Sequence, residues 1–328
     1  MSTIQTAAVI GAGVIGNGWI ARLLLNGVNV NVFDPSPEAP GHAAKVISNA
    51  ERAYANLLSV ALPQKGQLSF KSSVAEASAN ADIIIEAVPE RLDMKQSVYR
   101  EIESSASTEA IIASSTSGIL PTELQAGLEH PERLMVAHPF NPVYLLPLTE
   151  MVGGEKTSAA AIEKASNMLE SIGMFPLHIK KEIPAFIADR LLESVWREAL
   201  WLVNDGVATT EEIDDAIRYG FGLRWAQMGL FETYRLAGGE AGMRHFISQF
   251  GPCLEWPWTH LMDVPEFTEE LVDKVSNQSD EQSGMHSIRA LEQKRDDNLV
   301  EILKVLKDNR WGAGNALQSF ESKLLEKA

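Results

Sequence analysis

Two patterns of hydrophobic and polar positions follow one another along the chain. In the first part, short apolar runs alternate with segments whose apolar residues recur at helical spacing. The apolar runs cover residues 7–10, 28–33, 68–71, 82–87, 110–113, 134–137, 145–152 and 175–179. The predicted helices between them cover about residues 14–25, 41–60, 92–104 and 158–171. Because strands that alternate with helices are typical of α/β folds, we predict a doubly wound, mostly parallel sheet.

The pattern changes after about residue 181. Long helical stretches follow, beginning with 185–204 and continuing to Lys307, and one of them opens with the capping box Thr209-x-x-Glu212. No strand-like alternation is obvious in this part of the sequence. A chain of 328 residues is long enough for two domains. The predicted domains are an α/β domain at residues 1–181 and an all-helical C-terminal domain at residues 182–328.

A glycine-rich GxGxxG loop joins the first predicted strand to the first predicted helix. Gly11 permits a tight turn, Gly13 lets the backbone approach a pyrophosphate, and Gly16 allows close packing of helix on strand. The helix that follows starts at Val14 and Ile15, where free N–H groups and the helix dipole favour an anion. A strand before the loop and a helix after it predict a Rossmann-type dinucleotide site.

Asp34 ends the second predicted strand, where a dinucleotide fold places an acidic residue. Its carboxylate would accept hydrogen bonds from the adenosine ribose and would repel a 2′-phosphate. We therefore predict NAD as the cofactor, in preference to NADP. The alternative is that Asp34 is a turn residue before Pro35.

A second motif, His-Pro-Phe-Asn-Pro, begins at His138, and Glu150 follows it twelve residues after the histidine. Histidine is suited to removing the proton of an alcohol near neutral pH, and a carboxylate on its far ring nitrogen would fix its tautomer. A surface turn is the alternative, because two prolines bracket the motif. Strand-like runs on both sides instead place His138 at a strand end, where open α/β sheets bind ligands.

These motifs resemble the 3-hydroxyacyl-CoA dehydrogenase superfamily in order and spacing. The resemblance rests on the glycine loop, the segment 115–117 of sequence Ser-Thr-Ser, the histidine motif with its later glutamate, and the segment 186–192. It implies a Rossmann-type NAD domain and a helical domain used for homodimerisation. It also implies that His138 is the catalytic base and Glu150 its carboxylate partner.

Four further positions carry over from the resemblance. Ser117 and Asn141 match residues that hydrogen-bond the reacting oxygen or orient the nicotinamide. Glu90 and Lys95 match cofactor contacts near the nicotinamide-side ribose.

The sequence departs from the CoA-using members at two places. Those members resemble one another in a long lysine-rich hairpin after the second strand, whereas residues 35–72 here hold few cations. An acyl-CoA carries several phosphate charges, so we do not expect CoA as substrate. The second departure is Asp189, where CoA enzymes usually carry Asn. An anionic side chain there would favour a cationic ligand, although an exposed helical residue is an equal alternative.

Arg224 and Trp225 indicate what the substrate carries instead of CoA. Members that act on free acids resemble this Arg-aromatic pair, and a guanidinium fork suits a carboxylate. Aromatic residues concentrated in the helical half are able to hold a quaternary ammonium group, although aromatics at helical spacing are more often core. We therefore expect a small, free 3-hydroxy acid with a positive centre. The alternatives are another free 3-hydroxy acid, as in the L-gulonate dehydrogenase and lambda-crystallin branch, a 3-hydroxybutyryl-CoA substrate, or a non-catalytic protein on an enzyme scaffold.

The composition narrows the class of partner. The chain holds 44 acidic and 28 basic residues, for a formal net charge of −16. Because phosphate-binding surfaces need clustered Lys and Arg, we expect no nucleic acid and no anionic membrane as partner. No segment approaches the roughly 20 apolar residues that cross a bilayer. The seven histidines show no paired metal spacing, so no metal is predicted.

Two features point to a cytoplasmic protein. The N-terminal residues lack the basic region and apolar core of a secretory signal. The single cysteine, Cys253, excludes an internal disulfide and fits a reducing compartment.

Overall fold

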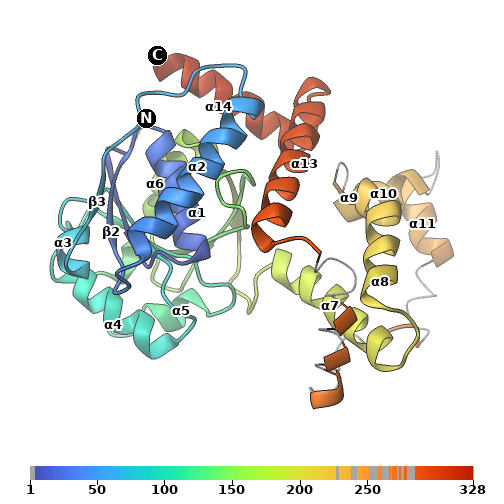
Figure 1. Ribbon diagram of the computed structural model, residues 1–328. Coiled ribbons are helices and arrows are strands. Elements are labelled where there is room, and N and C mark those ends of the chain that lie inside the picture. The colour runs from blue at the N-terminus through green and yellow to red at the C-terminus, as the bar shows by residue number, and fades with distance from the viewer. Residues whose placement is uncertain are drawn as a thin grey trace. The chain divides into compact units, whose positions relative to one another are not determined.

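Figure 1 shows the computed structural model of the chain. The structure describes residues 4–226, 229–237, 242–250, 257–260, 266, 268–271, 273–274, 277–278 and 285–327. Cys253 lies outside these residues. Contacts within the chain define two compact units, Met1–Ile187 together with Gln293–Ala328, and Ala188–Glu292.

The first unit is built on an eight-stranded sheet in the order β3-β2-β1-β4-β5-β6-β7-β8. The strands are β1 (Thr6–Ile10), β2 (Asn29–Phe33), β3 (Leu68–Phe70), β4 (Ile83–Glu86), β5 (Ile111–Ser114), β6 (Leu134–Pro139), β7 (Leu148–Gly153) and β8 (Phe175–Ile179). Strands β6 and β7 are antiparallel, and the other neighbours are parallel. The predicted doubly wound, mostly parallel sheet is therefore confirmed. The strand order reverses between β1 and β4, where such sheets bind ligands.

Both faces of the sheet are covered, which explains the continuous apolar runs in its strands. In β1, Ala7 and Val9 belong to one buried cluster, and Ala8 and Ile10 belong to the other. The helices of this part are α1 (Val14–Leu25), α2 (Ala39–Leu57), α3 (Val74–Ser78), α4 (Leu92–Glu103), α5 (Pro121–Leu124), the short 3-10 helix Pro131–Arg133 and α6 (Ala159–Ser171). Helix α6 begins where the Ser158 hydroxyl accepts a hydrogen bond from the backbone N–H of Ala161.

The last residues of the chain return to the first unit. They form α13 (Ile288–Asp308) and α14 (Ala313–Lys327), drawn in red beside the blue N-terminal helices in Figure 1. Leu303 and Phe320 are buried in the same cluster as α1 and α2. Glu321 accepts hydrogen bonds from Ser59, and Lys323 donates one to Glu170. The predicted division between residues 181 and 182 places these helices in the helical domain, whereas their contacts place residues 293–328 in the first unit. Hydrophobic periodicity predicts a helix, but it does not indicate which surface the apolar face of that helix covers.

The regular elements among the described residues of the second unit are all helices. Its elements are α7 (Ala188–Asn204), α8 (Thr210–Ala216), the π-helical turn Ile217–Phe221, α9 (Gly222–Trp225), α10 (Gly229–Ala237) and α11 (Gly242–Phe250). The predicted capping box at the start of α8 is confirmed. The Thr209 hydroxyl accepts from the Glu212 N–H, and the Glu212 carboxylate accepts from the Thr209 N–H.

Candidate active site

His138 and Glu150 lie opposite each other on the antiparallel strands β6 and β7. The Nδ1 atom of His138 is 2.9 Å from Oε2 of Glu150. Both side chains are buried, and Glu150 has no exposed surface. The two strands turn back on each other between the residues, so a separation of twelve positions becomes direct contact. The structure thus brings the predicted pair together.

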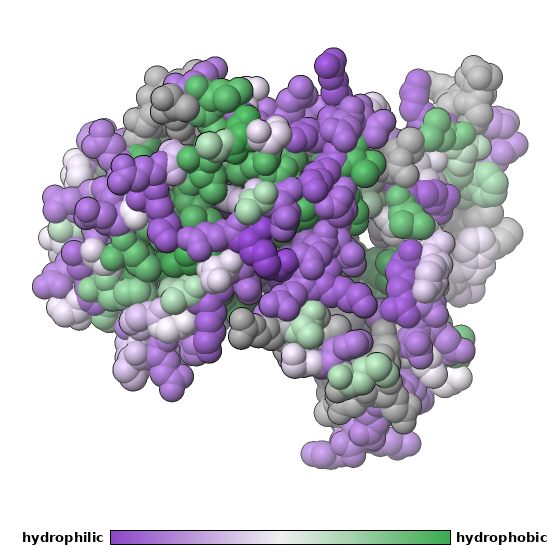
Figure 2. Space-filling view, turned by 45° about the horizontal axis from the view of Figure 1, so that its top comes forward, coloured by the Kyte–Doolittle hydropathy of each residue, from purple (hydrophilic) through white to green (hydrophobic). Residues whose placement is uncertain are grey.

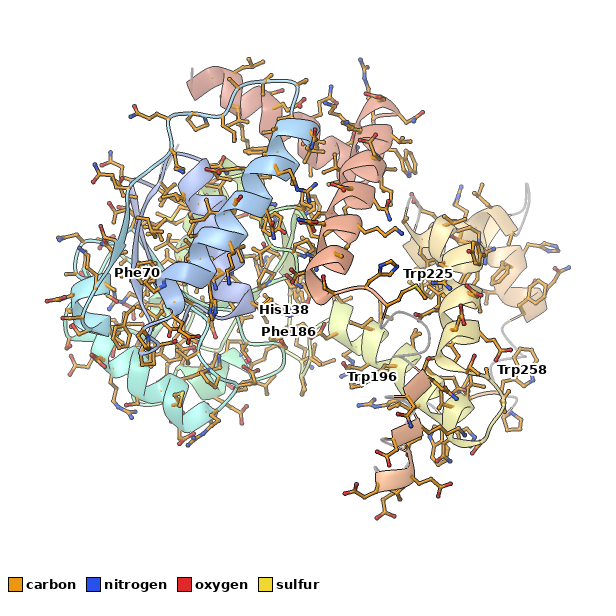
Figure 3. The ribbon with its side chains drawn as sticks, in the orientation of Figure 1. Phe70, His138, Phe186, Trp196, Trp225 and Trp258 are labelled. Carbon is orange, nitrogen blue, oxygen red and sulfur yellow. The ribbon has the colours of Figure 1, made fainter. Side chains whose placement is uncertain are left out.

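The surroundings of the pair hold both partners in place. The second carboxylate oxygen of Glu150 accepts a hydrogen bond of 3.0 Å from the backbone N–H of Ile187. The His138 ring packs against Phe140 and Phe186, with ring centroids 5.1 Å and 5.7 Å away. Figure 3 shows Phe186 beside His138. With Nδ1 facing a carboxylate, the nitrogen that accepts a proton in the neutral ring is Nε2.

The remaining predicted residues of the first unit gather at one edge of the sheet. The glycine loop follows β1, Asp34 follows β2, Glu90 follows β4 and Ser117 follows β5. Asn141 follows β6, which is parallel to β5. The carboxyl ends of parallel strands share an edge, so these side chains surround one region. Ser117 and Asn141 are exposed there.

The glycine loop fits the pyrophosphate of a dinucleotide. Gly11 has a φ of +99°, and a Cβ there would lie 2.5 Å from the Ala87 carbonyl oxygen. A Cβ on Gly16 would lie 1.9 Å from the Gly11 oxygen, so close packing requires both glycines. A Cβ on Gly13 would meet no protein atom within 4 Å. Gly13 is also the N-cap of α1 and makes no side-chain cap, so the helix N-terminus presents open space and N–H groups to an anion.

Residues on either side of this opening complete the cofactor loop. Val14 is 70% exposed, and Ile15 packs against the core. Asp34 accepts hydrogen bonds of 2.7 Å from the Ala12 N–H and 2.8 Å from the Ser36 N–H. The carboxylate therefore holds the glycine loop to the end of β2. Its contact with the ribose stays a prediction.

Lys95 lies in a buried network at the end of β4. Its Nζ donates to Glu86 at 2.8 Å and is 3.2 Å from Glu90. The other Glu86 oxygen accepts from the Tyr99 hydroxyl at 2.5 Å and from the Ser114 hydroxyl at 2.6 Å. Burial first, and then the charge of Glu86, hold the pKa of Tyr99 well above its usual value. The structure thus places the Lys95 ammonium, which the resemblance assigned to the cofactor, on two carboxylates of the protein.

Glu90 connects this network to Ser117. One Glu90 oxygen accepts hydrogen bonds from the Thr116 hydroxyl and, at 3.1 Å, from the Ser117 N–H. Burial raises the pKa of Glu90, but the Thr116 hydrogen bond and the Lys95 charge outweigh burial and hold it below its usual value. Glu90 is therefore a carboxylate at neutral pH. The sequence analysis did not identify Glu86 or Tyr99, and the only signal was an acidic residue at the end of an apolar run.

The other predicted residues lie in the second unit. Asp189 is the second residue of α7 and is half-buried. Arg224 is exposed on the short helix α9, and the Trp225 ring packs 4.6 Å from that of Phe221. Their roles stay predictions.

No group of three or more His, Cys, Asp or Glu side chains in the described part of the chain is arranged to hold a metal ion. Among the same residues, no helix combines the length and the apolar character that crossing a membrane requires.

Both parts of the chain are similar to known proteins. Residues 6–183 match the NAD binding domain of 3-hydroxyacyl-CoA dehydrogenase, and residues 186–284 match the C-terminal domain. The chain is 58% identical to an L-carnitine dehydrogenase of Mesorhizobium japonicum, covering 100% of this chain and 92% of that protein. It is 52% identical to an L-carnitine dehydrogenase of Pseudomonas putida, covering 96% and 98%.

A solved structure is also similar. It is a 5-formyl-3-hydroxy-2-methylpyridine 4-carboxylic acid 5-dehydrogenase, described as an NAD+ dependent dismutase. The TM-score is 0.77 at 30% identity, over 93% of this chain and 99% of that one. The matched domain confirms the predicted NAD cofactor. The chain belongs to the 3-hydroxyacyl-CoA dehydrogenase family.

Proposed function

We propose that the protein is an NAD-dependent dehydrogenase that oxidises the 3-hydroxyl group of L-carnitine to 3-dehydrocarnitine. The observation that carries the chemistry is the buried contact between His138 and Glu150. The similarity to two proteins named L-carnitine dehydrogenase, at 58% and 52% identity, supports the substrate. NAD, when bound, accepts the hydride that leaves C3 of the substrate.

His138 removes the hydroxyl proton through Nε2. Glu150 accepts the hydrogen bond from Nδ1 and stabilises the imidazolium that forms. Ser117 and Asn141 hold the substrate oxygen as its negative charge develops, which stabilises the transition state. The gathering of these residues at one sheet edge supports the assignment.

Substrate recognition is assigned to residues of the second unit. Arg224 binds the carboxylate of carnitine through its guanidinium fork. Trp225 and Asp189 are proposed to bind the substrate at its trimethylammonium end, because aromatic faces and carboxylates both attract that group.

The few cations of residues 35–72 support a substrate without CoA phosphates. Residues 35–72 hold Lys45, Arg52, Lys65 and Lys71. Arg52 is paired with Asp297, and Lys65 with Glu51 at 2.9 Å. Two of the four cations are thus already neutralised by carboxylates of the chain, which leaves little charge to bind several phosphates.

A substrate panel tests the proposal. NADH formation at 340 nm should be fast with L-carnitine and at least about a hundredfold slower, per kcat/KM, with L-gulonate or 3-hydroxybutyryl-CoA. If either of the other two compounds is oxidised faster than L-carnitine, that compound is the substrate and the proposal is wrong. If none of the three is oxidised, a non-catalytic protein is favoured.

In the same assay, Arg224→Met should raise KM for carnitine by about tenfold or more and leave KM for NAD within about twofold. Equal KM values in variant and wild type would remove Arg224 from the site.

We further propose a cytoplasmic homodimer that associates through the helical unit. Figure 2 shows hydrophobic side chains at the surface among hydrophilic ones. On α7, Leu191, Leu192 and Trp196 are each more than half exposed, and large exposed apolar side chains are typical of association surfaces. Light scattering coupled to gel filtration should give about twice the mass of one chain, and a single-chain mass would contradict the dimer.

A further inference from the structure

The loop that carries Asn141 is held from one side by α1, the helix that starts the cofactor site. Arg22 donates from Nε to the Val143 carbonyl at 2.7 Å and from Nη2 to the Leu146 carbonyl at 3.3 Å. Its Nη1 donates to the Ile172 carbonyl at 3.0 Å. Because Arg22 is only 2% exposed, moving the loop would take two of its three carbonyl acceptors away from a buried cation, which is costly.

The same side of the loop is also packed tightly. A Cβ on Gly18 of α1 would lie 2.8 Å from the Cβ of Val143. The loop closes on itself as well, because the backbone N–H groups of Leu145 and Leu146 each donate to the Pro142 carbonyl at 2.9 Å. The backbone after Asn141 is therefore a compact turn pressed against α1.

The other side of the loop is held by the C-terminal segment of the chain. The Tyr144 hydroxyl donates to Oδ2 of Asp296 on α13 at 2.5 Å. Asp296 is 1% exposed, and its Oδ1 accepts two hydrogen bonds from the Arg295 guanidinium. Burial, followed by the hydrogen bond to Asp296, raises the pKa of Tyr144, so the phenol stays protonated and keeps donating.

We propose that Asp296 is a positioning residue, which acts through Tyr144 to hold the loop of Asn141 in the geometry that oxidation requires. This inference rests on the proposed function, in which Asn141 binds the reacting oxygen. Tyr144 is three residues from Asn141, and the intervening Pro142 restricts the backbone that joins them. Arg22 holds two carbonyl groups of the loop, and Asp296 holds the Tyr144 side chain. Removing either contact therefore frees the loop on the side that faces that residue.

A neighbouring residue provides a matched control. Asp297 also lies on α13, but its side chain is 59% exposed and pairs with Arg52 of α2. Asp297→Ala therefore removes a contact between α13 and the rest of the first unit without touching the loop. Asp296→Asn keeps an oxygen that accepts the Tyr144 hydrogen bond, whereas Asp296→Ala removes it.

Hydrogen exchange tests the positioning without using any substrate. In Asp296→Ala, the amides of Leu145 and Leu146 should exchange about tenfold faster or more than in the wild type, and in Asp297→Ala they should not. The affinity for NADH, measured by fluorescence, should stay within about twofold in both, because the glycine loop is untouched. Unchanged exchange in Asp296→Ala would overturn the proposal even if carnitine proved not to be the substrate.

Kinetics with whichever hydroxy acid the wild type oxidises provides the second measurement. Asp296→Ala should lower kcat by about tenfold or more, since small misplacements near the reacting atoms are costly. Asp297→Ala and Asp296→Asn should retain most of the wild-type kcat. Tyr144→Phe, which removes the same hydrogen bond from the other side, should repeat the loss if Asp296→Ala fails to fold. A kcat that falls equally in Asp296→Ala and Asp297→Ala would mean that α13 contributes only to stability.

Discussion

Two fully buried carboxylates, Glu86 on β4 and Glu150 on β7, lie in the same sheet and have different partners. Glu86 receives hydrogen bonds from the Lys95 ammonium, from two hydroxyl groups and from the Val88 N–H. Glu150 faces the imidazole of His138 and one backbone N–H. Lysine carries its charge throughout the neutral pH range, whereas histidine gains and loses a proton within it. The comparison favours a role in geometry for the Glu86 network, and it supports the proposed role of the Glu150 pair in proton transfer.

The largest expected effect comes from the His138 and Glu150 pair, which is proposed to accept the hydroxyl proton. His138→Ala should abolish turnover, leaving less than a few per cent of wild-type kcat, because it removes the imidazole proposed to accept the hydroxyl proton. NADH binding, measured by fluorescence titration, should stay nearly intact. Glu150→Gln is the companion variant, and it should lower kcat strongly because an amide stabilises the imidazolium less well than a carboxylate does. Substantial activity in His138→Ala would identify another group as the base.

The second largest effect is expected for a variant that tests the structural role of the Glu86 network. Glu86→Gln removes the nearer carboxylate of Lys95 and should destabilise the fold by roughly 2–4 kcal/mol, since it leaves a buried ammonium with a single charged partner. It should also weaken NADH binding by about tenfold, because Glu90 and the Ser117 backbone are linked to Lys95. Urea unfolding and NADH fluorescence measure the two quantities. A variant with wild-type stability and full NADH affinity would contradict a structural role for the network.

The smallest expected effect also concerns the Glu86 network. Tyr99→Phe removes one hydrogen bond to Glu86 and leaves the Lys95 pair intact. The free energy of unfolding should fall by about 1–2 kcal/mol, with NADH affinity and kcat within about twofold of the wild type. A large loss of kcat in Tyr99→Phe would show that the network takes part in the reaction as well as in the fold, and the distinction between the two carboxylates would fail.

Much of the first unit could be predicted from local sequence. The apolar runs predicted each strand of the sheet to within a few residues, because both faces of a parallel sheet are buried. The glycine loop could be interpreted position by position, because each glycine answers a local steric requirement. The His138 and Glu150 contact was also predictable, since two strands joined by a short connection bring residues twelve apart into register.

Other contacts could not be predicted, because their partners are far apart in the sequence. Asp296 is one of 44 acidic residues, and nothing in its neighbourhood distinguishes it until α13 lies against the loop of Tyr144, 152 residues away. Lys95 matched a cofactor contact by position, yet its ammonium faces Glu86, which the sequence analysis passed over as the end of a strand.

Local steric and periodic constraints in the amino-acid sequence are therefore enough to specify the α/β sheet, the dinucleotide loop and the pairing of His138 with Glu150. The attachment of residues 293–328 to the first unit, and with it the support of the Asn141 loop, depends on which apolar surfaces bury one another. That choice reflects the summed free energy of many contacts between distant residues, which hydrophobic periodicity along the chain does not encode.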